Sequence, residues 1–151
     1  MSMDAQSFCR KIDVVTVKGS SVSTSIYTYD TLLNQKFPQL STPKFTNLDL
    51  AEVLKQQAQD YDTSAWENDG DLVQLRKLVT PKFRAIFNEG LNSYLNGKWQ
   101  ISREKLLEAD KLMADSDIGG DGPSRTILNY MEVRDWVCPN DWKGYRPLTN
   151  K

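Results

Sequence analysis

The stretch Phe83–Met113, FRAIFNEGLNSYLNGKWQISREKLLEADKLM, decides the fold that this sequence predicts. Its apolar residues recur at helical spacing in two sets, which are Phe83, Ile86, Phe87, Leu91, Tyr94 and Leu95, followed by Trp99, Leu106, Ala109, Leu112 and Met113. Asn96 and Gly97 lie between the two sets and are typical turn residues. The stretch therefore predicts two antiparallel helices joined by a short turn.

Part of this helical hairpin resembles one tetratricopeptide unit. The small, turn, aromatic and large positions of that unit match Gly90, Gly97, Trp99, Leu106 and Ala109. The small residues would let the helix backbones approach closely, and the larger ones would fill the space between turn and groove. The match is partial, and no second copy is visible, whereas a repeat array needs about three stacked units. An ordinary helical hairpin is the alternative.

Composition and charge set limits on the function. The 151 residues fit one compact domain or a small domain with an appended segment, and 39% hydrophobic with 26% charged residues is ordinary for a soluble protein. A net charge of -1 gives no electrostatic basis for binding nucleic acid or an anionic membrane surface. No apolar run approaches the roughly 20 residues that span a bilayer, and the N-terminus lacks a signal-peptide core. We expect a soluble, cytoplasmic chain without direct membrane insertion and without a nucleic-acid partner.

The content of histidine and cysteine argues against several kinds of chemistry. The chain has no histidine, which removes the commonest general base and the Ser-His and Cys-His nucleophile pairs. Cys9 and Cys138 lie near opposite ends and form no Cys-x-x-Cys motif. The acidic stretches 60–71 and 115–122 lack the residue order of an EF-hand loop. We therefore expect reduced thiols, no metal site, and no hydrolase of the common types.

Near the N-terminus, the sequence predicts a β-hairpin from about Arg10 to Tyr29. Residues 10–18, RKIDVVTVK, are rich in β-branched side chains, and residues 24–30, TSIYTYD, follow the turn residues 19–21. A lone hairpin is marginal in water. We expect this one to join a sheet or to lie on a surface.

The same residues resemble the last two strands of a class III adenylate/guanylate cyclase catalytic domain. The resemblance rests on Arg10–Gly19, RKIDVVTVKG, followed by Ile26–Asp30, IYTYD. It implies that Lys18 is the lysine that contacts the triphosphate of the nucleotide, with an exposed hairpin lysine as the alternative. The family's metal-binding aspartates, phosphate-binding turn, base-specifying residues and Asn/Arg pair have no counterpart here. We therefore expect no catalytic residue and no cyclase activity in the isolated chain.

After the hairpin, residues 31–46, TLLNQKFPQLSTPKFT, are typical of an extended connector because two prolines lie among polar residues. This connector divides the chain into a terminal hairpin of a cyclase-like domain, 1–30, and a helical tail, 47–151. The predicted fold class is mainly α with an N-terminal β-hairpin.

Besides the central hairpin, three shorter helices are expected in the tail. The first runs from about Leu48 to Tyr61, with Asn47 or Thr46 as its N-cap. The second covers the leucines at 72, 75 and 78, and the third begins at Pro123. The third would cover the end of the central hairpin.

The C-terminal segment 136–148, WVCPNDWKGYRPL, is aromatic without regular periodicity. Large aromatic side chains are costly to leave in water, so they either insert into a partner or pack back on the helices. Packing within the chain is the simpler alternative. As interaction anchors the sequence offers Trp66, Trp99, Trp136, Trp142 and Tyr145.

Four patterns in the second half resemble the segment that trails the cyclase domain in large cyclases of single-celled eukaryotes. They are Trp66–Arg76, Phe83–Trp99, Asp121–Met131 and Pro139–Thr149. The hypothesis is a non-catalytic, cyclase-derived interaction or structural module in a larger assembly, which docks through its helical tail onto a protein partner or a cyclase catalytic domain.

The alternative is the C-terminal segment of a longer cyclase that makes cyclic nucleotide from ATP or GTP. Mg²⁺ or Mn²⁺ would be needed only in that intact enzyme, and the chain itself is expected to need no cofactor. The resemblance also permits a location in the cilium or on the cytoplasmic side of a membrane protein.

Overall fold

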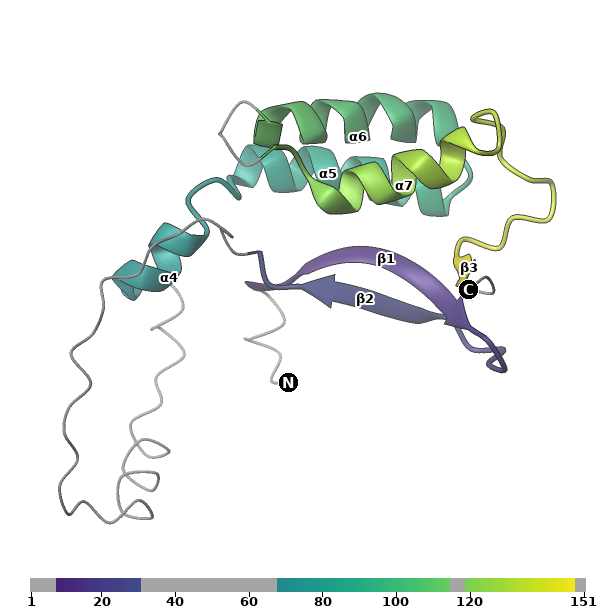
Figure 1. Cartoon of the computed structure of the whole chain (residues 1–151), viewed down its shortest axis with the longest axis horizontal. Coiled ribbons are helices and arrows are strands. Elements are labelled where there is room, and N and C mark those ends of the chain that lie inside the picture. The colour runs from purple at the N-terminus through teal and green to yellow at the C-terminus, as the bar shows by residue number, and fades with distance from the viewer. Residues whose placement is uncertain (1–7, 31–67, 115–118, 149–151) are drawn as a thin grey trace, which may run out of the picture.

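The structure is a computed structural model, and it describes residues 8–30, 68–114 and 119–148. Its elements are β1 (Arg10–Val17), β2 (Thr24–Thr28), α4 (Gly70–Leu75), α5 (Pro81–Leu95), α6 (Trp99–Met113), α7 (Gly122–Glu132) and β3 (Arg146–Leu148). Helices α5, α6 and α7 lie together on one side of a small sheet (Figure 1). The predicted connector 31–46, the helix expected at 48–61 and the anchor Trp66 lie outside the described residues.

The helical hairpin predicted from Phe83–Met113 is confirmed as α5 and α6. The Thr80 side chain accepts a hydrogen bond from the backbone N–H of Phe83, and Pro81 occupies the first turn of α5. Gly97, with φ of +73°, allows the sharp turn between the helices. At the contact between them, a Cβ on Gly90 would lie 2.9 Å from Cγ of Leu106. Gly90 therefore lets α5 and α6 approach closely.

The expected third helix is confirmed as α7. The Asp121 carboxylate accepts a hydrogen bond from the backbone N–H of Ser124, which caps the helix, and Pro123 lies in the first turn. α7 packs against α6 and completes the core. The core residues are Phe83, Phe87, Leu91, Tyr94, Trp99, Leu106, Ala109, Met113, Ile127, Leu128 and Met131.

The predicted β-hairpin is confirmed, and it belongs to a three-stranded mixed sheet with the order β2-β1-β3. β1 and β2 pair antiparallel, with an irregularity between Lys11 and Asp13. β3, the last described element, pairs parallel with β1, placing Val15 beside Arg146. The fold is thus mainly helical, with the N-terminal hairpin in a small sheet.

The sheet joins the two ends of the described chain. β1 and β2 come from the predicted hairpin region 1–30, whereas β3 comes from the predicted tail 47–151. Within the described ranges no helix is long and apolar enough to cross a membrane.

Candidate functional site

Lys18, the residue to which the cyclase resemblance gives a role, lies directly after β1. Its side chain is exposed, and it forms no ion pair with the part of the chain that the structure describes. Gly19 follows with φ of +86°, and the backbone N–H of Ser20 donates to the carbonyl of Val17 at 3.0 Å. The turn therefore presents the Lys18 ammonium to solvent.

Two of the predicted anchors, Trp99 and Trp142, face the protein's own helices. Trp99 is only 2% exposed, and its ring centroid lies 5.4 Å from that of Trp142. Tyr94 and Tyr130 complete an aromatic cluster with them, with centroid distances of 5.0 Å from Tyr94 to Trp142 and 6.1 Å from Tyr130 to Trp142. Both tryptophans therefore pack against other residues of the same chain.

The C-terminal segment is held against the end of α5 at two points. The indole Nε1 of Trp142 donates a hydrogen bond to the carbonyl oxygen of Leu95 at 3.1 Å. Gly144, with φ of +77°, passes so close that a Cβ there would lie 3.0 Å from the same oxygen. Since the last carbonyls of a helix have no partner within the helix, Trp142 satisfies one of them.

Burial changes the proton affinity of the cluster's phenols. Burial raises the pKa of Tyr94 far above its ordinary value, and the nearby Asp13 carboxylate raises it further. Burial also raises the pKa of Tyr130. The Tyr94 hydroxyl is buried and has no hydrogen-bond partner in the described ranges. Both phenols therefore lose their protons less readily than an exposed tyrosine would.

The third described tryptophan, Trp136, lies in a strained turn after α7. Asp135 and Trp136 have φ values of 53° and 62°, a conformation that is costly for residues other than glycine. The guanidinium of Arg103 lies 4.2 Å from the Trp136 ring centroid, and Gln100 Nε2 donates to the Trp136 carbonyl at 3.3 Å. These contacts hold the half-buried indole on the surface of α6 and direct the chain toward the sheet.

Beyond this turn, the chain encloses an open hollow of about 390 Å³, here called the C-terminal hollow. It is lined by Thr16, Tyr130, Arg134, Pro139, Asp141, Trp142, Lys143, Tyr145 and Pro147. The guanidinium of Arg134 lies 3.8 Å from the Tyr130 ring centroid, and its Nη1 donates to the Tyr130 carbonyl at 3.0 Å. The other donors of Arg134 and the ammonium of Lys143 form no hydrogen bond with the described residues. The hollow thus combines aromatic walls with two available cations.

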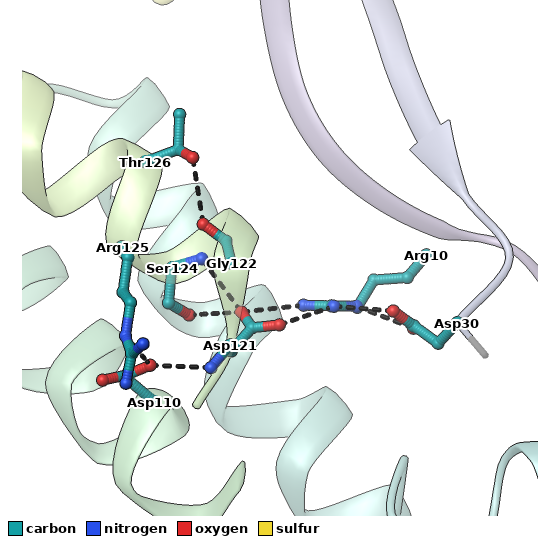
Figure 2. A network of polar contacts seen from close by, with 8 residues as sticks. All are labelled: Arg10, Asp30, Asp110, Asp121, Gly122, Ser124, Arg125 and Thr126. Atoms are coloured by element: carbon teal, nitrogen blue, oxygen red, sulfur yellow. Dashed lines mark hydrogen bonds and ion pairs between the residues drawn. The ribbon is translucent and has the colours of Figure 1, made fainter. Parts of the chain in front are cut away.

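A buried ion-pair network joins the hairpin to the tail, and Figure 2 shows its residues. Arg10, on β1, donates to both carboxylate oxygens of Asp30 at 2.7 and 2.8 Å. It also reaches Asp121, at the start of α7, at 2.8 and 3.2 Å. Although burial by itself lowers the pKa of the guanidinium, the hydrogen bonds to the two carboxylates raise it overall. Arg10 is thus a permanently charged structural link.

Two aromatic rings of α5 also lie against the guanidinium of Arg10. Its guanidinium carbon lies 4.9 Å from the ring centroid of Phe83 and 4.2 Å from that of Phe87, which allows cation–π contact. Asp110 accepts a hydrogen bond from the backbone N–H of Asp121 at 2.7 Å and pairs with Arg125 at 2.8 Å (Figure 2). The sequence showed Arg10 only as part of the cyclase-like motif. The one signal of burial was its position at the head of a β-branched strand.

A second ion pair ties β1 to β3. Arg146 donates to the Asp13 carboxylate through Nη2 at 2.7 Å and through Nε at 2.9 Å. Asp13 is only 4% exposed. This pairing was not predicted, because the two residues are separated by 133 positions in the sequence.

Within the described ranges, no group of three or more His, Cys, Asp and Glu side chains could hold a metal ion. The described residues thus provide no ligand set for the Mg²⁺ or Mn²⁺ of an intact cyclase. Cys9 and Cys138 are not joined by a disulfide, and burial raises the pKa of the Cys138 thiol.

The chain matches no family model, no curated protein and no solved structure. Its resemblance to class III cyclases is therefore a prediction from the motifs.

Proposed function

We propose that this chain is a non-catalytic interaction module, derived from a class III adenylate/guanylate cyclase, that docks within a larger assembly through its helical tail. The C-terminal hollow is the observation that supports docking. It opens to solvent between α7 and the C-terminal segment, and Trp142 and Tyr145 form part of its wall. Aromatic and arginine side chains are the types that contribute most to protein–protein binding.

The charges in the hollow define the partner segment that it would accept. Arg134 and Lys143 outnumber Asp141, so the lining carries a net positive charge. The donors of Arg134 and Lys143 suit carboxylate oxygens, and the aromatic walls suit an apolar or aromatic side chain. The hollow is therefore assigned to a partner segment that combines an acidic residue with an aromatic one.

Co-purification with charge-reversal variants tests this assignment. Lys143→Glu reverses one charge in the hollow, and Tyr145→Ala removes part of its aromatic wall. Lys98→Glu is the matched control, since Lys98 is exposed and does not line the hollow. At physiological salt, the unmodified chain and the Lys98 variant should return the same stoichiometric partner, and the two hollow variants should lose it. A partner retained by all four proteins, or a clean monomer, would contradict docking at this site.

The second candidate function is the C-terminal segment of a longer, active cyclase. This candidate rests on the Val-Lys-Gly motif, and the exposed position of Lys18 after β1 is compatible with a phosphate contact as well as with an ordinary hairpin lysine. In a longer native polypeptide, Lys18→Ala should lower cyclase activity, and Lys98→Ala should leave it unchanged. Full activity of the Lys18 variant would exclude the nucleotide role of this residue.

The size of the native polypeptide separates the two candidates. An antibody raised against the segment DWKGYRPLT should detect a band near 17.3 kDa if the module stands alone. A band several times larger would favour the cyclase segment, and the Lys18→Ala assay would then be decisive.

A further inference from the structure

A pocket of about 280 Å³, here called the sheet pocket, lies between the sheet and the start of α7. All three strands contribute to its walls, since β1 supplies Ile12 and Asp13, β2 supplies Ile26 and β3 supplies Arg146. The pocket therefore lies under the middle of the sheet. The residues that line it and those that line the C-terminal hollow are all different, so the two are separate sites.

An irregularity in β1 shapes this pocket. In a regular strand, neighbouring side chains point to opposite faces of the sheet. Ile12 and Asp13 are neighbours on β1, yet both line the pocket, and the pairing of β1 with β2 shifts register between Lys11 and Asp13. Such irregularities re-aim side chains and are over-represented next to functional sites. Here the irregularity brings an aliphatic and a charged side chain to one pocket.

Most of the wall is aliphatic. Pro123, Thr126 and Ile127 of α7 line the helical side, and their spacing places them on one face of the helix. Ile12 and Ile26 lie on the side of the sheet. The space between them suits a branched aliphatic group, because such a group is removed from water on both sides.

The polar end of the pocket offers donors and no unoccupied acceptor. Arg146 donates to Oδ2 of Asp13 through Nε and Nη2, and Oδ1 of Asp13 accepts from the backbone N–H of Val14 at 2.8 Å. The Nη1 group of Arg146 forms no hydrogen bond with any described residue. Arg10, by contrast, uses Nε, Nη1 and Nη2 to reach two carboxylates. Arg146 thus has capacity for a further acceptor at the pocket.

The charges of the lining decide which acceptor fits. Asp13 and Arg146 neutralise each other, and no other lining residue is charged. A charged ligand would therefore bring an unbalanced charge into largely apolar surroundings, which is costly. A carbonyl oxygen accepts a hydrogen bond from the guanidinium without adding a charge.

We propose that the sheet pocket binds a small neutral molecule that combines a carbonyl oxygen with a branched aliphatic chain. The oxygen accepts from Arg146, and the chain lies among Ile12, Ile26 and Ile127. Apolar walls with few convergent polar groups are typical of small-molecule sites. The volume of the pocket limits the ligand to a small molecule.

Titration of the full chain with 4-methylpentanamide tests this proposal, with 4-methylpentanoate as a probe of nearly the same shape that carries a charge. The chain is labelled with ¹³C at the isoleucine δ1 methyl groups, and NMR follows their shifts. The methyl signals of Ile12, Ile26 and Ile127 should move with the amide, and those of Ile86 and Ile101, outside the lining, should not. The carboxylate should bind about tenfold more weakly or worse.

Two variants test the walls and the donor separately. Thr126→Trp fills the pocket from an exposed position on α7, and Asn129→Trp is the matched control, exposed on the same helix and outside the lining. Arg146→Lys keeps a cation beside Asp13 but removes the guanidinium donors. Thr126→Trp and Arg146→Lys should each weaken binding of the amide about tenfold, and the control should not. Thermal melting verifies that each variant remains folded.

Three results would overturn the proposal. The first is the absence of shifts at the three pocket methyl groups with the amide at millimolar concentration. The second is equal or tighter binding of the carboxylate, which would contradict a neutral ligand. The third is full binding of the amide by folded Thr126→Trp, which would place the ligand elsewhere. Because the two sites share no lining residue, none of these results depends on docking at the C-terminal hollow.

Discussion

Arg10 and Asp121 are separated by 111 positions in the sequence, yet their side chains form an ion pair at 2.8 Å with both groups almost fully buried. Asp121 also caps α7 through the N–H of Ser124. The Asp121 carboxylate thus both caps α7 and forms an ion pair with Arg10 on β1. The pair therefore links the predicted hairpin region to the start of α7 in the predicted tail.

Breaking this pair should destabilise the protein strongly. Removal of one partner leaves a buried charge without its counterion, at a cost of about 3–5 kcal/mol. Arg10→Met and Asp121→Asn, alone and combined, should give a coupling free energy above about 1 kcal/mol in urea denaturation. The exposed pair Glu89 and Lys105, at 2.9 Å, is the control. Its coupling should be much smaller, because solvent screens an exposed ion pair, and equal coupling in both cycles would contradict the structural role of Arg10.

Replacing Tyr94 with phenylalanine should stabilise the protein. The hydroxyl is buried and unpartnered within the described ranges, and such a group costs about 1–3 kcal/mol. Tyr94→Phe should therefore raise the free energy of unfolding by about 1 kcal/mol, measured by denaturant titration. Tyr27→Phe, at a position 49% exposed, should change little. A loss of stability in Tyr94→Phe would mean that the hydroxyl has a partner in solution.

The same side chain should make the protein sensitive to alkali. Because burial raises the pKa of Tyr94 in the folded state, the unfolded chain loses this proton first, near pH 10. Below that pH the phenol is neutral in both the folded and the unfolded state. As the pH rises further, its ionisation in the unfolded state lowers the free energy of unfolding. Unfolding free energies measured between pH 8 and about pH 11 should decline less in Tyr94→Phe than in the unmodified chain. Parallel declines would contradict the raised pKa.

Gly90→Ala should destabilise the helical hairpin. A new Cβ would lie 2.9 Å from both Cγ and Cδ2 of Leu106 and 3.2 Å from Cβ of Lys105. Overpacking of this kind costs about 1–3 kcal/mol, which exceeds the gain of up to about 1 kcal/mol in helix propensity. The melting temperature should fall. Gly122→Ala, with no atom within 4 Å of the added Cβ, should leave it unchanged or raise it.

Trp142→Phe should loosen the C-terminal segment from α5. The substitution keeps an aromatic ring but removes the hydrogen bond from Nε1 to the Leu95 carbonyl. The expected loss is about 1–3 kcal/mol, because the carbonyl loses its side-chain partner. Limited proteolysis should cut the segment after Trp136 faster in this variant. Trp136→Phe is the control, because it keeps the hydrogen bond of Trp142. If both variants were cut equally fast, this hydrogen bond would not be what holds the segment on α5.

Helices α5, α6 and α7 and the β-hairpin were predictable because their signals are local, whereas the helix expected over the leucines at 72, 75 and 78 ends at Leu75 as α4. The spacing of the apolar residues from Phe83 to Met113, the turn at Gly97 and the proline in the first turn of α7 each act within a few residues. β3 has no such signal. Arg146–Leu148 is short, includes a proline and lacks alternation, and it is a strand only because β1 lies beside it.

At the candidate site, too, only the local features were predictable. The sequence identified the large aromatic residues of the C-terminal segment, but it has no periodicity there that shows which of them face the protein interior. Trp142 faces inward because its indole donates a hydrogen bond to the Leu95 carbonyl and its ring packs in the aromatic cluster. The roles of Arg10 and Asp13 were likewise hidden, since their partners lie 111 and 133 positions away in the sequence.

The central position of β1 has a consequence for synthesis on the ribosome. β2 follows β1 closely and can pair with it at once, but β3 and Arg146 emerge only after all three helices of the core. Until then, Asp13 lacks its counterion, and one edge of β1 stays open to other nascent chains. The sheet must therefore close after translation has passed Leu148, and nascent chains stalled before that residue should depend on chaperones.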